Sequence, residues 1–383
     1  MYYALISATA GMVFTFIAMP FLLKYCYAKG KCDMPGGRRL HKQPIPRLGG
    51  VMFMPALLIG LSVACLCKGE MMIPIRTSSV LLAAGAILIY AFGFLDDWFG
   101  MRANPKFVVQ LIAALIMPLC GLYINNFYGM FGLYDLPFWF SYPLTVFVIL
   151  LIVNSVNLID GIDGLASGLC ICIFTIYMLL FLKQEKTTNY SFCVAGLVGS
   201  LLAFFCFNVW GKVQNKTKTF MGDSGSLILG YALAYLTLKY TMDPADTEKV
   251  LDHRNYALFL SFTLLVVPTF DVIRVAFYRI FHHKPVFGAD KNHIHHLIIA
   301  AGFSMHQALG IIMSLFAFFC VLNYALYVWG TGQTLIVCLD VVLFCAFFVV
   351  LDGIKKRRNR GDCCKNAIIN ERSAKRRYRR IVK

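Results

Sequence analysis

The sequence predicts an all-α integral membrane protein with about eleven transmembrane helices. Of its 383 residues, 59% are hydrophobic and 14% are charged, and the mean hydropathy is +0.69. Soluble domains carry about 25% charged residues, so the composition excludes an ordinary soluble enzyme. Eleven apolar windows have the roughly 17–25 residues that a membrane-crossing helix needs. They lie near residues 3–23, 48–67, 77–95, 107–123, 143–159, 165–182, 191–209, 225–240, 257–277, 306–326 and 333–351.

The first window has neither the basic start nor the small-residue cleavage site of a signal peptide, so we expect it to be retained as a helix. The fourteen cysteines are scattered, mostly through apolar runs and without paired spacing. This distribution indicates small packing residues and argues against a disulfide framework or a zinc ribbon.

The distribution of Lys and Arg predicts the orientation, because cytoplasmic loops are enriched in both. With the N-terminus outside, the cytoplasmic segments hold 28 Lys and Arg and the outer loops hold seven; without the tail, the cytoplasmic count is 15. We therefore expect an N-out, C-in protein, with a membrane domain over residues 1–353 and a basic cytoplasmic tail over 354–383. The tail supplies much of the net charge of +17. We expect it to bind anionic lipid headgroups rather than nucleic acid.

The most polar stretch inside an apolar region covers residues 154–165. Asn154 and Asn157 are three positions apart and share one face of a helix. Asp160 and Asp163 follow, and the glycine after each lets the backbone approach a ligand closely. Unpaired polar groups in lipid are costly, so the stretch indicates a functional site. The alternative is that these side chains only cap the end of a helix.

Two adjacent carboxylates, Asp96 and Asp97, end the third apolar window. Neighbouring carboxylates repel, so one holds a raised pKa unless a cation lies beside them. Such a pair suits a divalent metal or a general base. Lys106 follows at the mouth of the next window, where it could contact a lipid phosphate. The alternative for Lys106 is a side chain that merely reaches towards the membrane surface.

Asp223 lies among small residues at the start of the eighth window, within residues 220–230. The glycines there permit close approach of a phosphate or a metal, and a helix N-terminus favours an anionic ligand. The alternative is that Asp223 or Ser224 serves as the N-cap of this helix. The two roles are compatible.

Two basic segments complete the set. The first inner loop, residues 33–50, carries Arg38, His41 and Lys42 among prolines and glycines. These cations could bind a phosphate at the membrane surface. The alternative is that they only reflect the enrichment of Lys and Arg in cytoplasmic loops. The last inner loop carries Arg279 and five of the eight histidines: His282, His283, His293, His295 and His296. Imidazoles could bind zinc. We favour binding of a phosphate-rich substrate, because the aspartates elsewhere are hard ligands suited to Mg²⁺ or Mn²⁺.

Carboxylates, amides, cations and histidines gathered on the cytoplasmic side predict a phosphoryl-transfer site. A membrane transporter is the alternative from another class. It predicts polar groups near the bilayer midplane and inverted repeats, and we find no convincing repeat. A membrane zinc hydrolase is a second alternative. It would need a His-Glu-x-x-His motif on a helix, and the sequence lacks this motif.

Four of these clusters resemble, in order and spacing, the polyprenyl-phosphate N-acetylhexosamine-1-phosphate transferases, glycosyltransferase family 4. The motifs are Leu95-Asp-Asp97, residues 154–165, Gly222-Asp-Ser-Gly-Ser226 and His293-Ile-His-His296. The match covers roughly residues 1–350 and leaves the basic tail unexplained. The first inner loop and the His-Ile-His-His form resemble the WecA/TagO branch more than the peptidoglycan enzyme of the family.

The resemblance implies a reaction. Undecaprenyl phosphate attacks the β-phosphate of a UDP-N-acetylamino sugar, with GlcNAc favoured; UMP leaves, and a lipid-linked pyrophosphoryl sugar remains. It also implies dependence on Mg²⁺ or Mn²⁺, inhibition by tunicamycin, and a place in the bacterial inner membrane. The product would start an O-antigen, capsule, teichoic acid or similar surface glycan. The sequence does not give the sugar, and it leaves a homodimer open.

The resemblance implies residue roles as well. Asp223 matches a metal ligand and Asn157 a residue that helps to coordinate the metal. Asp96 matches the favoured base for the lipid phosphate, and we assign Asp97 to supporting the metal and the cations. The residues expected in catalysis are Asp96, Asp97, Asp160, Asp163 and His293, and those expected to bind substrate are Asn154, Arg279, His295, His296, Lys106, Arg38, His41 and Lys42.

Overall fold

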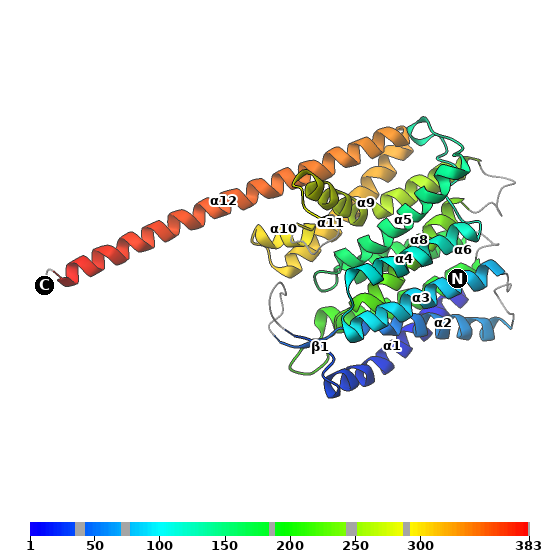
Figure 1. The fold of residues 1–383 in the computed structure, drawn as a ribbon, viewed down its shortest axis with the longest axis horizontal. Helices are drawn as coiled ribbons and strands as arrows, with labels where there is room; N and C mark the ends of the chain where they lie inside the picture. Colours follow the sequence, from blue (N-terminus) through cyan, green and yellow to red (C-terminus); the bar gives the residue numbers. More distant parts are fainter. Residues whose placement is uncertain (35–42, 70–76, 184–187, 243–250, 286–291, 382–383) are drawn as a thin grey trace.

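The computed structural model describes residues 1–34, 43–69, 77–183, 188–242, 251–285 and 292–381. These residues form a bundle of long helices (Figure 1). The helices are α1 (Tyr2–Ala28), α2 (Phe53–Lys68), α3 (Thr77–Phe99), α4 (Ala103–Leu119), α5 (Phe138–Ile159), α6 (Leu165–Leu182), α7 (Thr188–Phe205), α8 (Gly222–Met242), α9 (Leu251–Phe281), α10 (Ile294–Ala300), α11 (Met305–Val328) and α12 (Gln333–Ile381).

Short elements connect the helices. Two 3₁₀ turns are η1 (Gly49–Met52) and η2 (Met130–Gly132), and the π-helical turn η4 (Cys206–Trp210) continues α7. The strands β1 (Cys32–Asp33) and β2 (Ile45–Pro46) pair antiparallel, with Cys32 opposite Pro46.

The protein is an all-helical integral membrane protein. Nine helices among the described residues are long and apolar enough to cross a bilayer. Each of the eleven predicted windows falls on a helix, apart from a few residues at the ends. The two windows outside the nine lie on α4, whose apolar part spans Asn104–Leu119, and on α8, which carries Asp223 and Lys239. The number of crossing helices and their orientation stay predictions.

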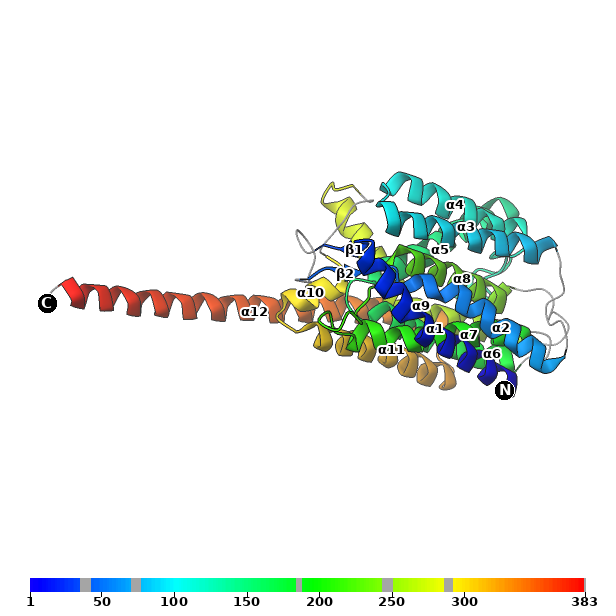
Figure 2. The ribbon, with the colours of Figure 1, turned by 90° about the horizontal axis from the view of Figure 1, so that it is seen from below.

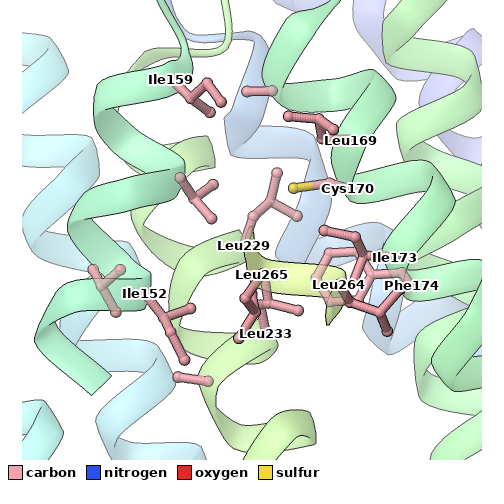
Figure 3. Packing of buried hydrophobic residues seen from close by; sticks show 14 of the residues in the cluster. Ile152, Ile159, Leu169, Cys170, Ile173, Phe174, Leu229, Leu233, Leu264 and Leu265 are labelled. Atoms are coloured by element: carbon pink, nitrogen blue, oxygen red, sulfur yellow. The ribbon is translucent and has the colours of Figure 1, made fainter. Parts of the chain in front are cut away.

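The core lies where α5, α6, α8 and α9 meet, and Figure 3 shows buried hydrophobic side chains of these helices gathered between them. Ile152, Leu169, Leu229 and Leu264 are each at most 2% exposed there. Lipid is as apolar as leucine, so close packing rather than escape from water favours this arrangement. The central helix α8 is buried along most of its length and therefore gives the site at its N-terminus a rigid support.

A backbone seam joins residues 46–50 to residues 220–221. It contains three hydrogen bonds of 2.8–3.0 Å, one of them from Gly50 N–H to Met221 O. A Cβ on Gly50 would overlap the Cα of Gly225, so only glycine permits this approach. The strands and α10 lie at the end of the bundle from which α12 extends, and the N-terminus lies at the opposite end (Figure 2). The seam thus brings the first loop onto the start of α8.

Candidate active site

A cavity of about 430 Å³ opens at the end of the bundle that carries the strands. Its walls come from the first loop, the end of α3, the turn after α5, the start of α8 and the segment around α10. The predicted site residues that line it are Asp97, Asn157, Asp160, Asp163, Asp223 and His296. Segments far apart in the sequence therefore line one cavity, and four of these six residues are aspartates.

Asp97 holds the start of α8. Its two carboxylate oxygens accept hydrogen bonds from the backbone N–H of Asp223 (2.9 Å), the backbone N–H of Ser224 (2.8 Å) and the hydroxyl of Ser224 (2.7 Å). The first N–H groups of a helix have no partner within it, so Asp97 caps α8 from another helix. This contact places the two aspartate motifs side by side.

Asp223 shares a cation with the aspartate pair. Lys106 Nζ lies 2.6 Å from Asp223 Oδ1 and 3.5 Å from Asp96 Oδ2. The amide of Asn157 donates to the same oxygen of Asp223 at 2.6 Å and to Ser226 Oγ at 2.7 Å. Lys106 therefore neutralises part of the acidic cluster and does more than reach towards the membrane surface.

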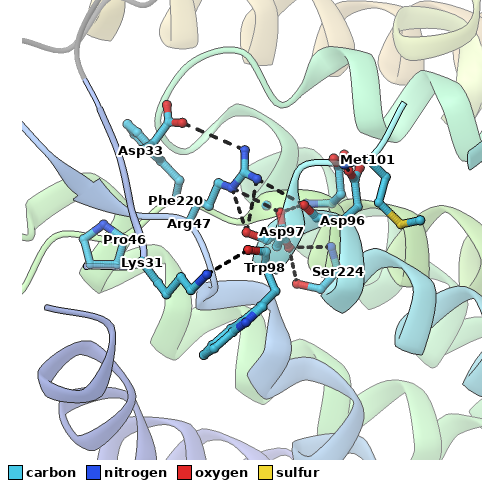
Figure 4. Close-up of polar contacts among 12 residues, drawn as sticks. Lys31, Asp33, Pro46, Arg47, Asp96, Asp97, Trp98, Met101, Phe220 and Ser224 are labelled. Carbon is cyan, nitrogen blue, oxygen red and sulfur yellow. Dashed lines mark hydrogen bonds and ion pairs between the residues drawn. The ribbon is translucent and has the colours of Figure 1, made fainter. Parts of the chain in front are cut away.

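Arg47 and Lys31 bind the carbonyl end of α3, as Figure 4 shows. Arg47 donates to the carbonyl oxygens of Asp96 (3.1 Å) and Asp97 (3.1 and 3.2 Å), and its guanidinium lies 3.9 Å from Asp33. Lys31 Nζ donates to Trp98 O at 3.1 Å. Cations at a helix C-terminus complement the macrodipole, and here they tie the first loop to the aspartate pair. Sequence reasoning noted the positive charge of this loop but not these partners.

Asp160 and Asp163 differ in their partners. Lys218 Nζ donates to Asp163 Oδ2 at 2.7 Å. Asp160 forms no hydrogen bond or ion pair with the described residues, and Asp223, Asp163 and Asp97 lie close enough to repel its charge. Burial, together with that repulsion, raises the pKa of Asp160 to about 8. A cation is the partner that this carboxylate lacks.

The donor set fits a hard divalent cation. In the described parts of the chain, no three His, Cys, Asp or Glu side chains already converge as a metal cage. The side chains of Asp160, Asp223 and Asn157 nevertheless line one cavity, and Asp160 has no partner among the described residues. Mg²⁺ prefers octahedral oxygen coordination and is usually held by one or two carboxylates with waters and substrate phosphates. These three residues would hold it.

The histidine segment is organised by Asp271, which is 2% exposed on α9. Its carboxylate accepts hydrogen bonds from His293 Nδ1 (2.9 Å), the backbone N–H of Ile294 (3.0 Å) and Arg274 (2.8 Å). Arg274 also donates to the carbonyl of Asn292. Sequence reasoning missed Asp271. A carboxylate three positions before an arginine inside an apolar window was the available signal.

The three histidines of this segment have different surroundings. His296 lines the cavity, and His293 is 4% exposed behind it. His295 is 2% exposed, and neither ring nitrogen has a hydrogen-bond partner among the described residues. A Cβ on Gly161 would overlap the His295 ring, so the glycine after Asp160 lets the two segments meet. Burial lowers the pKa of His295 to about 3, which keeps its ring neutral.

Other predicted residues lie apart from the cavity. Asn154 donates to Gln110 Oε1 at 3.0 Å and to Leu150 O at 2.8 Å, and it is not among the residues that line the cavity. Arg279 is buried on α9, also outside the cavity lining. Arg38, His41 and Lys42 lie outside the described residues. Their predicted roles in substrate binding stay predictions.

Comparisons with known proteins agree with this geometry. A model of glycosyl transferase family 4 matches residues 79–241, the region that contains Asp97, Asp160 and Asp223. A probable undecaprenyl-phosphate N-acetylglucosaminyl 1-phosphate transferase of Bacillus subtilis is 28% identical over 357 residues, covering 91% of this chain and 92% of the relative.

Two enterobacterial proteins named undecaprenyl-phosphate alpha-N-acetylglucosaminyl 1-phosphate transferase are also similar. The Escherichia coli K12 protein is 28% identical, with 77% of this chain and 76% of the relative covered. The Salmonella typhimurium protein is 29% identical, with 77% and 75% covered. The family match and the shared length agree with the motifs that meet at the cavity, and over residues 79–241 the chain is similar to glycosyl transferase family 4.

Proposed function

We propose that this protein transfers GlcNAc 1-phosphate from UDP-GlcNAc to undecaprenyl phosphate. A phosphate oxygen of the lipid attacks the β-phosphorus of the donor, the bond between the two phosphates breaks, and UMP leaves. The observation that supports this most strongly is the cavity, where Asp97, Asn157, Asp160 and Asp223 come together. All four lie in the region that matches the family model, and the relatives are named undecaprenyl-phosphate N-acetylglucosaminyl 1-phosphate transferases.

A divalent cation fits the chemistry. When bound, Mg²⁺ or Mn²⁺ would neutralise charge on the pyrophosphate. Asp160, Asp223 and Asn157 would hold it, and Asp97 would keep Asp223 in place through the start of α8. Lys106, already beside Asp223 and Asp96, supplies a cation for the phosphates.

The identity of the base that deprotonates the lipid phosphate is a separate proposal. A phosphate monoester has a second pKa near 6, so the acceptor is mostly ionised at neutral pH and needs a base mainly at lower pH. We assign that role to Asp96. Its Oδ1 accepts the backbone N–H of Met101 at 2.6 Å, while Oδ2 lies 3.5 Å from Lys106 Nζ. Lys106 could therefore bring the lipid phosphate close to Asp96.

We also propose that the cavity faces the cytoplasm of a bacterial inner membrane, where UDP-sugars are made. The cavity lies at the end of the bundle opposite the N-terminus, which agrees with the N-out, C-in distribution of Lys and Arg. Single cysteines at residues 212–217 should be labelled only from the cytoplasmic side, and cysteines at residues 127–140 only from outside. Labelling of 212–217 from outside would overturn this orientation.

The transfer itself is tested with purified protein, UDP-GlcNAc and undecaprenyl phosphate in detergent. UMP should appear only when both substrates are present, and tunicamycin should suppress it. Asp223→Asn should form little UMP, whereas Asp135→Asn should match wild type, because Asp135 is bonded to Asn126 far from the cavity. The transporter alternative predicts no UMP under any of these conditions. A panel of other UDP-N-acetylamino sugars then identifies the donor.

A further inference from the structure

A second cavity has a lining of a different character from that of the first. It measures about 460 Å³ and is formed by the last turns of α1, the π-helical turn η4 and the loop before α8. It is lined by Pro20, Leu23, Lys24, Tyr27, Ala28, Phe207, Asn215, Lys216 and Thr217. None of these nine residues is acidic, in contrast to the lining of the first cavity.

The described residues supply no counter-charge to the cationic groups of this second cavity. Neither Lys24 nor Lys216 forms an ion pair within the described residues. Lys216 Nζ lies 5.7 Å from the centre of the Tyr27 ring, so it lies close to the last turn of α1. The Tyr27 hydroxyl is buried and has no hydrogen-bond partner in the described part of the chain. Two ammonium groups and a spare hydroxyl are the donors that a phosphate needs.

Part of the lining is apolar. Pro20, Leu23 and Phe207 form it, and Phe16 packs on Phe207 one turn deeper in α1, at 5.8 Å between ring centres. Lys24 directly follows the apolar run of α1, which is where a bilayer changes from hydrocarbon to headgroups. The cavity therefore offers charge at headgroup level and hydrocarbon contact below it.

We propose that this second cavity binds one lipid that carries an anionic phosphate. Lys24 and Lys216 bind the phosphate, with a hydrogen bond from Tyr27, and a hydrocarbon chain of the lipid lies along Pro20, Leu23 and Phe207. Two sources share this chemistry: an anionic phospholipid of the surrounding bilayer, and a second molecule of a polyprenyl phosphate.

The bound lipid would stabilise a wall that both cavities share. Phe207 lines the second cavity and its neighbour Asn208 lines the first. Asn208 accepts a hydrogen bond from Gly164 N–H at 2.6 Å and donates to Thr219 O at 2.9 Å. Lys218, next to the Thr217 of the second cavity, holds Asp163 in the first. A lipid that orders this wall should therefore also fix the positions of Lys218 and Asp163 in the first cavity.

Native mass spectrometry of the detergent-purified protein tests the proposal with phosphatidylglycerol as the probe. Wild type should retain one molecule, and Lys24→Gln with Lys216→Gln should weaken that binding about 30-fold, since each basic residue near anionic lipid contributes about fivefold. Tyr27→Phe should weaken it by a smaller factor. The matched control is Lys29→Gln with Lys212→Gln, which removes the same charge from the same two segments outside the cavity lining. This control should bind as wild type does.

Further probes separate the outcomes. Phosphatidylcholine should not be retained, and equal retention of it would overturn the charge basis of the site. Equal losses in the cavity pair and the control pair would overturn its location. Retention of inorganic phosphate alone, with no preference for a lipid, would overturn the hydrocarbon contact. Displacement of phosphatidylglycerol by undecaprenyl phosphate would assign the site to the polyprenyl source, and its absence to the bulk phospholipid.

Discussion

Ser224 donates both its backbone N–H and its hydroxyl to the same carboxylate oxygen of Asp97, at 2.8 and 2.7 Å. The other oxygen of Asp97 accepts the N–H of Asp223. Three donors on one carboxylate make Asp97 a structural anchor for the metal-binding candidate Asp223. Asp97 thus positions Asp223 through the backbone, and its support of a metal stays a prediction.

Replacing this anchor should lower stability. Asp97→Asn leaves one acceptor oxygen for three donors, so a buried donor loses its partner, at a cost of about 1–3 kcal/mol. Ser224→Ala removes one of the three bonds and should cost about 1 kcal/mol. Thermal unfolding in detergent measures both, with Ser62→Ala as the control, because Ser62 is exposed and bonds only within its own helix. An unchanged melting temperature for Asp97→Asn would refute the anchoring role.

If Asp223 binds the metal, Asp223→Asn should change the Mg²⁺ requirement of the enzyme, which a loss of stability alone would not do. Asp223→Asn replaces a charged ligand with a neutral one, so turnover should fall by a factor on the order of 10²–10³, and the remaining activity should require more Mg²⁺. Activity measured against Mg²⁺ concentration, with Asp135→Asn as the control, gives both values. A normal Mg²⁺ titration with normal turnover would count against a metal role.

The contact between Gly161 and His295 should tolerate no extra atom. Gly161→Ala would push the His295 ring away, and displacing a catalytic segment by about 1 Å can cost on the order of 10²-fold in rate. Gly310→Ala is the matched control, because nothing lies within 4 Å of a Cβ there and alanine is the better helix former by about 0.5–1 kcal/mol. We expect UMP release to fall at least tenfold in the first variant alone. Equal rates would show that the segments do not need this contact.

The neutral ring of His295 should make the protein sensitive to acid. Its pKa is about 3 in the folded protein and about 6.5 when exposed, so the unfolded chain takes up the proton first. The stabilisation is complete above about pH 6.5 and is lost as pH falls, by up to about 1.4 kcal/mol per unit.

Melting temperatures at pH 7.5, 6.0 and 5.0 test this. His295→Gln should lose less stability on acidification than wild type, whereas His306→Gln, at an exposed position, should follow wild type. Parallel curves for wild type and His295→Gln would exclude His295 as the source.

Asp271 should be required for the histidine segment to hold its shape. Asp271→Asn leaves Arg274 and His293 without their carboxylate, and breaking a buried pair from one side costs about 3–5 kcal/mol. Asp352→Asn breaks an exposed pair with Lys356, which contributes about 0.5 kcal/mol at most. Thermal unfolding and the KM for the UDP-sugar are measured for both variants. The comparison distinguishes the loss of the buried ion pair from the general effect of removing one negative charge. Equal stability losses would contradict the role of Asp271.

The sequence was sufficient to predict the helices and most of the cavity lining. Long apolar windows have few alternatives to helices in a membrane, and polar residues inside them mark function because they are costly. Asp97, Asp160 and Asp223 could therefore be selected without knowing the fold. The distribution of Lys and Arg predicts that all of these clusters lie on one side of the membrane.

Contacts between distant segments could not be predicted in this way. Asn154 and Asn157 share a helix face, yet three residues separate them by about 4.5 Å along the axis. That step places Asn157 beside Asp223 and leaves Asn154 with Gln110. The partners of Arg47 are backbone carbonyls, which any sequence would supply. Their position depends on how the first loop crosses the end of α3.

The seam between residues 46–50 and 220–221 also bears on when the enzyme can first act during its synthesis. Thr219 donates its hydroxyl to the carbonyl of Pro46, 173 positions earlier in the chain. At about 5–20 residues per second, the ribosome needs on the order of ten seconds or more to make the intervening segments, and His296 follows later still. We expect a growing chain to remain inert until that histidine has emerged. Unfinished chains would then leave the lipid acceptor untouched.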